Sequence, residues 1–160
     1  MLPTAPEHSR APIDFRVDEQ SALTFRFALR DVQSGLQHAL DARLAPHGLT
    51  AVQGMVLDAL RHMPGANLAE VGAVLRVDAA AMSRQVTRLE ARGLCVRFRP
   101  RGDRRAVRVE LLPPGLELAA EFPPVLAEVT DLALAGFDAG ERSLLLGALH
   151  RMLLAPALDD

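Results

Sequence analysis

Apolar side chains recur at intervals of three and four residues along the segment that begins at Asp18. They are Phe25, Leu29, Val32, Leu36, Leu40 and Leu44. This spacing places them along one side of an α-helix, and the Pro46-His47-Gly48 sequence predicts its end. At about 27 residues the helix exceeds the mean of ~11–12 in globular proteins, so we expect it to pack against more than its own small domain.

Three shorter helices are predicted over the next part of the chain, each with a polar residue in front that can cap it. Thr50 stands three residues before Gln53, and Asn67 stands three residues before Glu70. Both pairs have the spacing of a capping box, in which the two residues satisfy each other's backbone N–H groups. Asp78 is expected to cap the third helix.

This third helix runs from Ala79 to Arg92 and ends at Gly93, the residue type that favours the left-handed conformation found after helix C-termini. Its inward positions are Met82, Val86 and Leu89. The opposite side carries short and guanidinium side chains, namely Ala80, Ser83, Arg84, Thr87 and Arg88. Such a face fits the major groove of DNA, so these five are candidate DNA-binding residues.

After Gly93 the period of the apolar positions changes from 3.6 to 2. Residues 95–99 and 107–111 alternate and predict the two strands of a hairpin. The tip between them carries Arg101, Arg104 and Arg105, whose planar, weakly hydrated guanidinium groups suit a narrow minor groove. Three short helices followed by such a hairpin have the arrangement of a winged helix-turn-helix.

The helical period resumes after Pro113-Pro114 in two further segments. The first contains Pro123-Pro124, which predict a kink or a split, and the second is capped by Asp138 with Glu141. The predicted fold class is therefore mainly α with a small β-hairpin wing (α+β). We expect a flexible arm over residues 1–17, a winged-helix lobe over 47–112, and long flanking helices over 18–46 and 114–155.

Charge is distributed unevenly along the chain, although the net charge is only −2. All 18 basic residues are Arg. Between Arg76 and Arg108 ten Arg stand against three acidic residues, a surplus of seven positive charges, whereas residues 1–75 and 109–160 sum to −2 and −7. A basic centre between acidic ends predicts a localised face that binds a polyanion.

Other classes of protein receive no support from the sequence. No apolar run approaches the ~18–20 residues of a membrane span, and the N-terminus lacks the pattern of a signal peptide, so we expect no membrane association and a cytoplasmic location. We interpret Cys95, the only cysteine, as a packed side chain rather than a redox sensor. No metal-ligand spacing or catalytic motif is present, which predicts no metal, no cofactor and no enzymatic activity.

The sequence resembles the MarR (multiple antibiotic resistance regulator) family of transcription factors over residues ~18–155. Four motifs carry the resemblance in the family's order and spacing. They are Leu49-Thr50-x-x-Gln53, Val77-Asp78, Arg84-x-x-x-Arg88-Leu89-Glu90-x-x-Gly93-Leu94, and Pro100-x-x-Asp103-Arg104-Arg105-Ala106 followed by Val107, Val109, Leu111 and Gly115.

The resemblance implies a homodimer in which residues 18–46 and 114–155 form the dimerisation helices. It makes Asp78 to Arg88 the major-groove reader and Arg104 and Arg105 the wing contacts to double-stranded DNA, with Asp103 bracing the wing through an ion pair. Two departures stand out. Ala79-Ala80-Ala81 replaces the Pro, Ser and Thr common in the family, leaving Ala80 to contact a thymine methyl, and Leu112 replaces a capping Thr.

These observations predict a DNA-binding transcriptional regulator, a ligand-responsive repressor of a pseudo-palindromic operator. Members of the family often bind small aromatic or phenolic acids, for which Arg26, Arg30 and His38 are the candidate ligand-binding residues. Two alternatives stay open, a sequence-neutral architectural DNA binder and a protein-binding winged helix. The wing assignment predicts that Arg105→Ala weakens DNA binding by ~1–3 kcal/mol, with Arg142→Ala as its neutral control.

Overall fold

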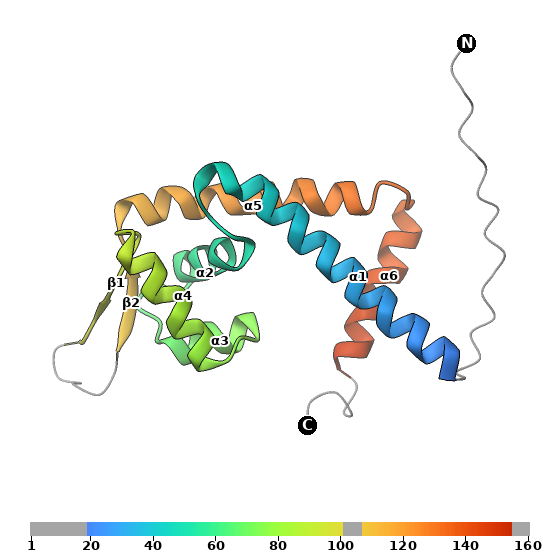
Figure 1. Cartoon of the computed structure of the whole chain (residues 1–160), viewed down its shortest axis with the longest axis horizontal. Coiled ribbons are helices and arrows are strands. Elements are labelled where there is room, and N and C mark those ends of the chain that lie inside the picture. The colour runs from blue at the N-terminus through green and yellow to red at the C-terminus, as the bar shows by residue number, and fades with distance from the viewer. Residues whose placement is uncertain (1–18, 101–106, 155–160) are drawn as a thin grey trace, which may run out of the picture. The chain divides into compact units, whose positions relative to one another are not determined.

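The computed structural model describes residues 19–100 and 107–154, and these form six α-helices, a 3-10 turn and a two-stranded sheet (Figure 1). In chain order the elements are α1 (Glu19–Leu44), η1 (Ala45–His47), α2 (Ala51–His62), α3 (Leu68–Leu75), α4 (Ala79–Ala91), β1 (Cys95–Phe98), β2 (Arg108–Leu111), α5 (Pro113–Ala133) and α6 (Ala139–Leu153). A mainly α fold with a β-hairpin wing is thereby confirmed.

The chain divides into two compact units, Met1–Gly35 and Leu36–Asp160. The core lies in the second unit, where α2 packs against α3, α4 and α5, and α4 packs against β1 (Figure 1). Leu44, Leu57, Met82, Leu89 and Val109 are among its fully buried side chains. This core supports the three short helices and the hairpin as one packed lobe.

The apolar stripe of α1 has two environments. Leu40 and Leu44, near its C-terminal end, are buried in the core. Phe25, Leu29 and Val32, in the first unit, are exposed. Among the described residues of the stripe, only those near the C-terminal end of α1 are buried.

Every cap predicted for the short helices is present. Thr50 Oγ1 accepts from Gln53 N at 3.3 Å, and Gln53 Oε1 accepts in return from Thr50 N at 3.1 Å. Asn67 with Glu70 and Asp138 with Glu141 form the same reciprocal pair. These bonds satisfy N–H groups that a helix leaves without partners, which fixes where α2, α3 and α6 begin.

The sequence between α4 and α5 also forms as predicted in outline. Gly93 has a φ of 67° and closes α4, and Cys95 then pairs with Leu111 at the base of an antiparallel hairpin. Each strand is one residue shorter than expected, since Arg99 and Val107 lie outside the ladder. The hairpin thus begins directly after α4, which holds it beside that helix (Figure 1).

Two features of α5 bear on the predictions. Of the kink or split expected at Pro123-Pro124, the split is wrong, because α5 is unbroken from Pro113 to Ala133 and contains both prolines. The expected loss of a cap is confirmed, since Leu112 makes no side-chain cap hydrogen bond. Pro113 at the first helical position compensates, because its ring already has the φ angle of a helix and it has no N–H to satisfy.

Candidate nucleic-acid interface

The surface of α4 is divided into a buried side and an open side. Asp78 Oδ1 accepts from Ala81 N at 2.8 Å and sets the first turn of the helix. Met82, Val86 and Leu89 have no exposed surface. Because these residues fix the rotation of α4 about its axis, the predicted reading residues lie on the outer side: Ala80, Arg84, Thr87 and Arg88 are exposed, and Ser83 is half-buried.

Arg84 and Arg88 lie one helical turn apart and are neighbours on the surface of α4. Within the described residues neither guanidinium has a hydrogen bond or an ion pair, and both side chains are exposed. Two adjacent cations without an internal partner are what a polyanion can neutralise without breaking existing bonds. Both residues therefore remain candidates for DNA contact.

The arginines of the basic centre differ in their hydrogen-bond partners, which the sequence did not reveal. Arg92 donates to the carbonyl oxygens of Gly48 and His47, at 2.7 and 3.3 Å, and ties the end of α4 to the turn before α2. Arg108 donates to Gly65 O at 2.6 Å and ties β2 to the loop before α3. These arginines stabilise the lobe, and their partners are backbone carbonyls for which the sequence carries no signal.

Arg97 is a third arginine with internal partners. Its guanidinium pairs with Glu90 through Nη1, and its Nη2 lies 2.9 Å from Ser83 O and 3.1 Å from Thr87 Oγ1. The backbone N–H of Arg97 donates to Glu90 Oε1 at 2.7 Å. Arg97 therefore joins β1, the first strand of the hairpin, to the middle of α4.

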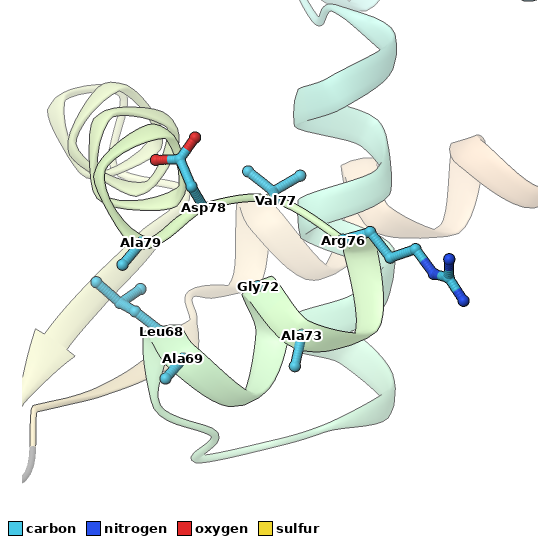
Figure 2. A pocket seen from close by; sticks show the side chains of 8 residues that line it. All are labelled: Leu68, Ala69, Gly72, Ala73, Arg76, Val77, Asp78 and Ala79. Carbon is cyan, nitrogen blue, oxygen red and sulfur yellow. The ribbon is translucent and has the colours of Figure 1, made fainter. Parts of the chain in front are cut away.

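Arg76 lies at the turn between α3 and α4 and adopts the left-handed region, with a φ of 51°. Its backbone N–H bonds to the carbonyls of Ala73 and Gly72, which closes α3. Arg76 is one of eight residues that line a hollow beside this turn. Figure 2 shows its side chain directed away from the other lining residues. The hollow is lined mainly by small or apolar side chains such as Leu68 and Ala69, and we assign it no separate chemistry.

The turn also explains why α3 contains a glycine. A Cβ atom on Gly72 would lie 2.7 Å from the carbonyl oxygen of Val77, closer than real Cβ contacts. Val77 N in turn donates to Gly72 O at 2.9 Å. Gly72 therefore permits the close approach of two backbone segments that sets α4 against α3.

The predicted wing contacts Arg101, Asp103, Arg104 and Arg105 lie outside the described residues and stay predictions. At the base of the wing, Arg99 is exposed and lines a hollow with Arg97, Phe98 and Val107. Arg99 follows the β1 strand that Arg97 holds against α4.

The candidate ligand-binding residues are all on α1. Arg30 is bonded to Asp31 at 2.9 Å and lies 5.0 Å from the centre of the Phe27 ring. Arg26 and His38 are exposed. No hydrogen bond or ion pair joins these three residues in the described part of α1, so their role in ligand binding stays a prediction.

Cys95 is buried at the start of β1, with 2% of its surface exposed, and its Sγ is 3.8 Å from Val86 O. Burial, aided by the charge of Glu90 and opposed by that of Arg97, raises the pKa of the thiol from 9.0 to about 11. The thiolate is the reactive form, so the raised pKa and the burial both disfavour reaction. This environment fits a packed side chain.

We expect the native protein to react only slowly with an alkylating reagent at pH 7–8, whereas the unfolded chain reacts fully. Because the folded pKa exceeds the unfolded one, the native thiol holds its proton longer, and this contribution to stability is lost as pH rises from about 9 through about 11. Mass spectrometry after timed alkylation, with a urea-unfolded control, measures the difference. Native alkylation as fast as that of the unfolded chain would show that Cys95 is accessible.

The described residues hold no group of three or more His, Cys, Asp and Glu side chains placed to bind a metal ion. Across the same residues, no helix combines the length and the apolar character needed to cross a membrane.

Comparisons with known proteins agree with this geometry. The MarR family profile matches residues 49–107. The chain is 34% identical over 149 residues to the HTH-type transcriptional repressor NicR of Pseudomonas putida, covering 91% of both proteins. Its fold is similar to that of a mutant MarR from E. coli complexed with operator DNA, with a TM-score of 0.77 and 24% identity over 85% of this chain and 99% of that one.

A second solved structure is more similar in sequence. It is BpsR of Bordetella bronchiseptica, described with the regulation of its DNA binding by 6-hydroxynicotinic acid, and it has a TM-score of 0.73 and 29% identity over 81% of this chain and 98% of that one.

Proposed function

This chain belongs to the MarR family of winged helix-turn-helix transcriptional regulators, and we propose that it is a ligand-responsive repressor that binds a pseudo-palindromic operator as a homodimer. The observation that carries the proposal is a pair of guanidinium groups on the open side of α4, those of Arg84 and Arg88, which have no partner among the described residues. Arg recognises guanine through two parallel hydrogen bonds and also neutralises phosphates. Such a regulator works in the cytoplasm, where it meets the DNA.

The homodimer is supported by apolar surface that the described residues leave uncovered. Leu144 on α6 is 75% exposed, and Leu23 and Phe27 on α1 are exposed as well. Exposed patches of large apolar side chains mark interaction sites in soluble proteins. In the proposed dimer, α1, α5 and α6 of the two copies cover one another, and each copy presents its α4 to one half of the operator.

The proposed effector is a hydroxylated aromatic carboxylic acid. BpsR, the relative at 29% identity, is regulated by 6-hydroxynicotinic acid, and NicR, a repressor, is 34% identical to this chain. An aromatic acid needs an apolar wall and a cation for its carboxylate. Arg26, Arg30 and His38 are our candidates for that cation, although Arg30 would have to leave Asp31 to serve.

A mobility-shift titration on genomic fragments tests both parts of the proposal. We expect a bound site with two-fold symmetry and half-site centres about one helical turn apart, roughly 34–36 Å. Affinity should fall about a thousandfold between 50 and 200 mM salt, because several phosphate contacts release counterions. Added 6-hydroxynicotinic acid should release the DNA, with nicotinic acid, which lacks only the hydroxyl group, as the matched control.

The outcomes separate the proposal from its alternatives. Equal affinity for random and selected DNA would favour an architectural binder. A monomer with no DNA affinity would favour a protein-binding winged helix. Specific binding that neither 6-hydroxynicotinic acid nor phenolic acids release would leave the regulator in place and remove the proposed effector class.

A further inference from the structure

The hydroxyl group of Thr87 is occupied inside the protein. Thr87 Oγ1 donates its proton to Ser83 O at 2.9 Å and accepts from Arg97 Nη2 at 3.1 Å. A hydroxyl has one proton to donate and two lone pairs to accept with. With its proton used, Thr87 cannot donate to a base edge, and its methyl group is the part of the side chain without a polar partner.

Ser83 is in the opposite situation. Its Oγ lies 3.4 Å from Arg97 Nη2 and accepts from it, while its own proton has no acceptor among the described residues. Ser83 therefore keeps a donor for DNA. The guanidinium of Arg97 thus donates to both hydroxyl groups of the α4 face, and of the two only Thr87 donates its own proton within the described residues, to Ser83 O.

Arg97 is poorly placed to contact phosphate itself. Its side chain is only 23% exposed, and its Nη1 and Nη2 atoms already bond to Glu90, Ser83 and Thr87. Glu90 neutralises its charge, so this arginine adds little to the field that DNA meets. The planar guanidinium is required, because the compact ammonium group of a lysine cannot bond the Glu90 carboxylate and the oxygens of Ser83 and Thr87 at the same fixed angles.

We propose that Arg97 is a positioning residue for sequence recognition: by donating to Thr87 Oγ1 it holds the Thr87 hydroxyl inward, so that Thr87 reads DNA through its methyl group and Ser83 reads as a hydrogen-bond donor. This inference rests on the proposed role of α4 in the major groove. There the partner of the Thr87 methyl is the C5-methyl of a thymine, and the partner of Ser83 is an acceptor such as O4 of thymine or N7 of a purine.

Two substitutions of Thr87 test the inference, because one keeps the methyl group and the other keeps the hydroxyl. Thr87→Val should bind the operator within about twofold of the wild type. Thr87→Ser should lose about fourfold in affinity per half-site, the effect expected for one buried methyl group. Thr87 is exposed, so neither variant should impair folding.

A deoxyuridine scan of the operator identifies the partner on the DNA. Replacing one thymine in each half-site by deoxyuridine removes the C5-methyl group and should weaken the wild type and Thr87→Val, but not Thr87→Ser. If Thr87→Val loses affinity and Thr87→Ser keeps it, the hydroxyl reads the DNA and the inference is wrong. Equal effects of the two variants, whether large or absent, would overturn it as well.

Arg97→Gln provides the test of positioning. Its ratio of specific to non-specific affinity should fall at least about fivefold, while its affinity for non-specific DNA and the slope of log affinity against log salt stay unchanged. Arg97→Lys, which keeps the charge and loses the fork, should not restore the ratio. A salt slope reduced by about one per half-site would show instead that Arg97 contacts phosphate, and an unchanged ratio would refute its positioning role.

Failure of the inference is distinguishable from failure of the proposed function. If α4 does not enter the groove, neither Arg84→Ala nor any Thr87 variant changes the affinity for the operator. If α4 does enter the groove and the inference is wrong, Arg84→Ala weakens binding while the two Thr87 variants fail to separate as stated.

Discussion

Gly115→Ala is expected to lower the stability of this protein by about 3 kcal/mol, at the upper end of the cost of overpacking a core. For a chain of this size that corresponds to a fall in Tm of roughly 6–12 °C. The sign is informative, because Gly115 lies in the first turn of α5, where helix propensity alone would make alanine favourable by ~1 kcal/mol. Thermal unfolding followed by circular dichroism at fixed protein concentration measures the change.

The physical reason is an approach of two backbones. A Cβ atom on Gly115 would overlap with the carbonyl oxygen of Leu94, which joins α4 to β1. That oxygen also accepts from Leu112 N at 3.0 Å. Because backbone cannot change rotamer, α5 must move away from Leu94, and α5 is also packed along α2.

Two other glycines provide graded controls. A Cβ on Gly54 would lie 2.5 Å from Phe122 Cδ2, a side-chain atom that can move, so Gly54→Ala should cost less and Phe122→Leu should relieve it. Gly35→Ala meets nothing within 4 Å and should be neutral or stabilising. Leu94→Ala should not rescue Gly115→Ala, because the clash is with backbone. A Gly115→Ala variant as stable as Gly35→Ala would disprove the close contact.

Local chemistry made much of this fold predictable. The ends of α2, α3 and α6 follow from reciprocal caps that span only four residues, such as Thr50 with Gln53. The rotation of α4 follows from the spacing of Met82, Val86 and Leu89, which the core buries completely. Such features need no knowledge of distant parts of the chain, so the sequence is sufficient to predict them.

Features that depend on distant contacts were not predictable. The sequence does not show that Gly115 meets Leu94, nor that Arg92 binds carbonyls 44 and 45 residues away. A count of charges along the sequence treats every arginine of the basic centre as an equal candidate for DNA contact. The structure separates arginines with internal partners, such as Arg97, from Arg84 and Arg88, which have no hydrogen bond or ion pair within residues 19–100 and 107–154.

The contacts of an arginine, which its sequence position does not show, also decide the choice of a control for the DNA-binding tests. Arg142 lies outside the basic centre, but its guanidinium donates to Leu134 O at 2.9 Å and to Phe137 O at 3.2 Å, and it pairs with Asp131. Arg142→Ala would remove these bonds, which join the start of α6 to the turn that follows α5. It is therefore unsuitable as a neutral control. Arg151, exposed in the last turn of α6 and without a bond to the described residues, replaces it.

The double substitution Arg84→Ala/Arg88→Ala is expected to have the largest effect on DNA affinity. Each lost guanidinium contact should cost ~1–3 kcal/mol per half-site, which is about 5- to 150-fold. Thermal stability should stay within ~0.5 kcal/mol of the wild type, because neither side chain has a partner in the described structure and alanine favours the helix. Mobility-shift titration with the operator, alongside thermal unfolding, measures both quantities.

The salt dependence of the two single variants assigns each arginine a role. A variant whose slope of log affinity against log salt falls by about one per half-site has lost a phosphate contact, whereas one with lower affinity and an unchanged slope has lost a contact to a base edge. Arg105→Ala in the wing should lose ~1–3 kcal/mol, and Arg151→Ala should match the wild type in affinity and slope.

If the double variant bound the operator as tightly as Arg151→Ala does, α4 would not be the reading helix. The wing alone would then have to recognise the operator. Its tip offers three arginines to the minor groove, and that groove distinguishes little more than A·T from G·C pairs, so the wing could not specify a unique operator by itself.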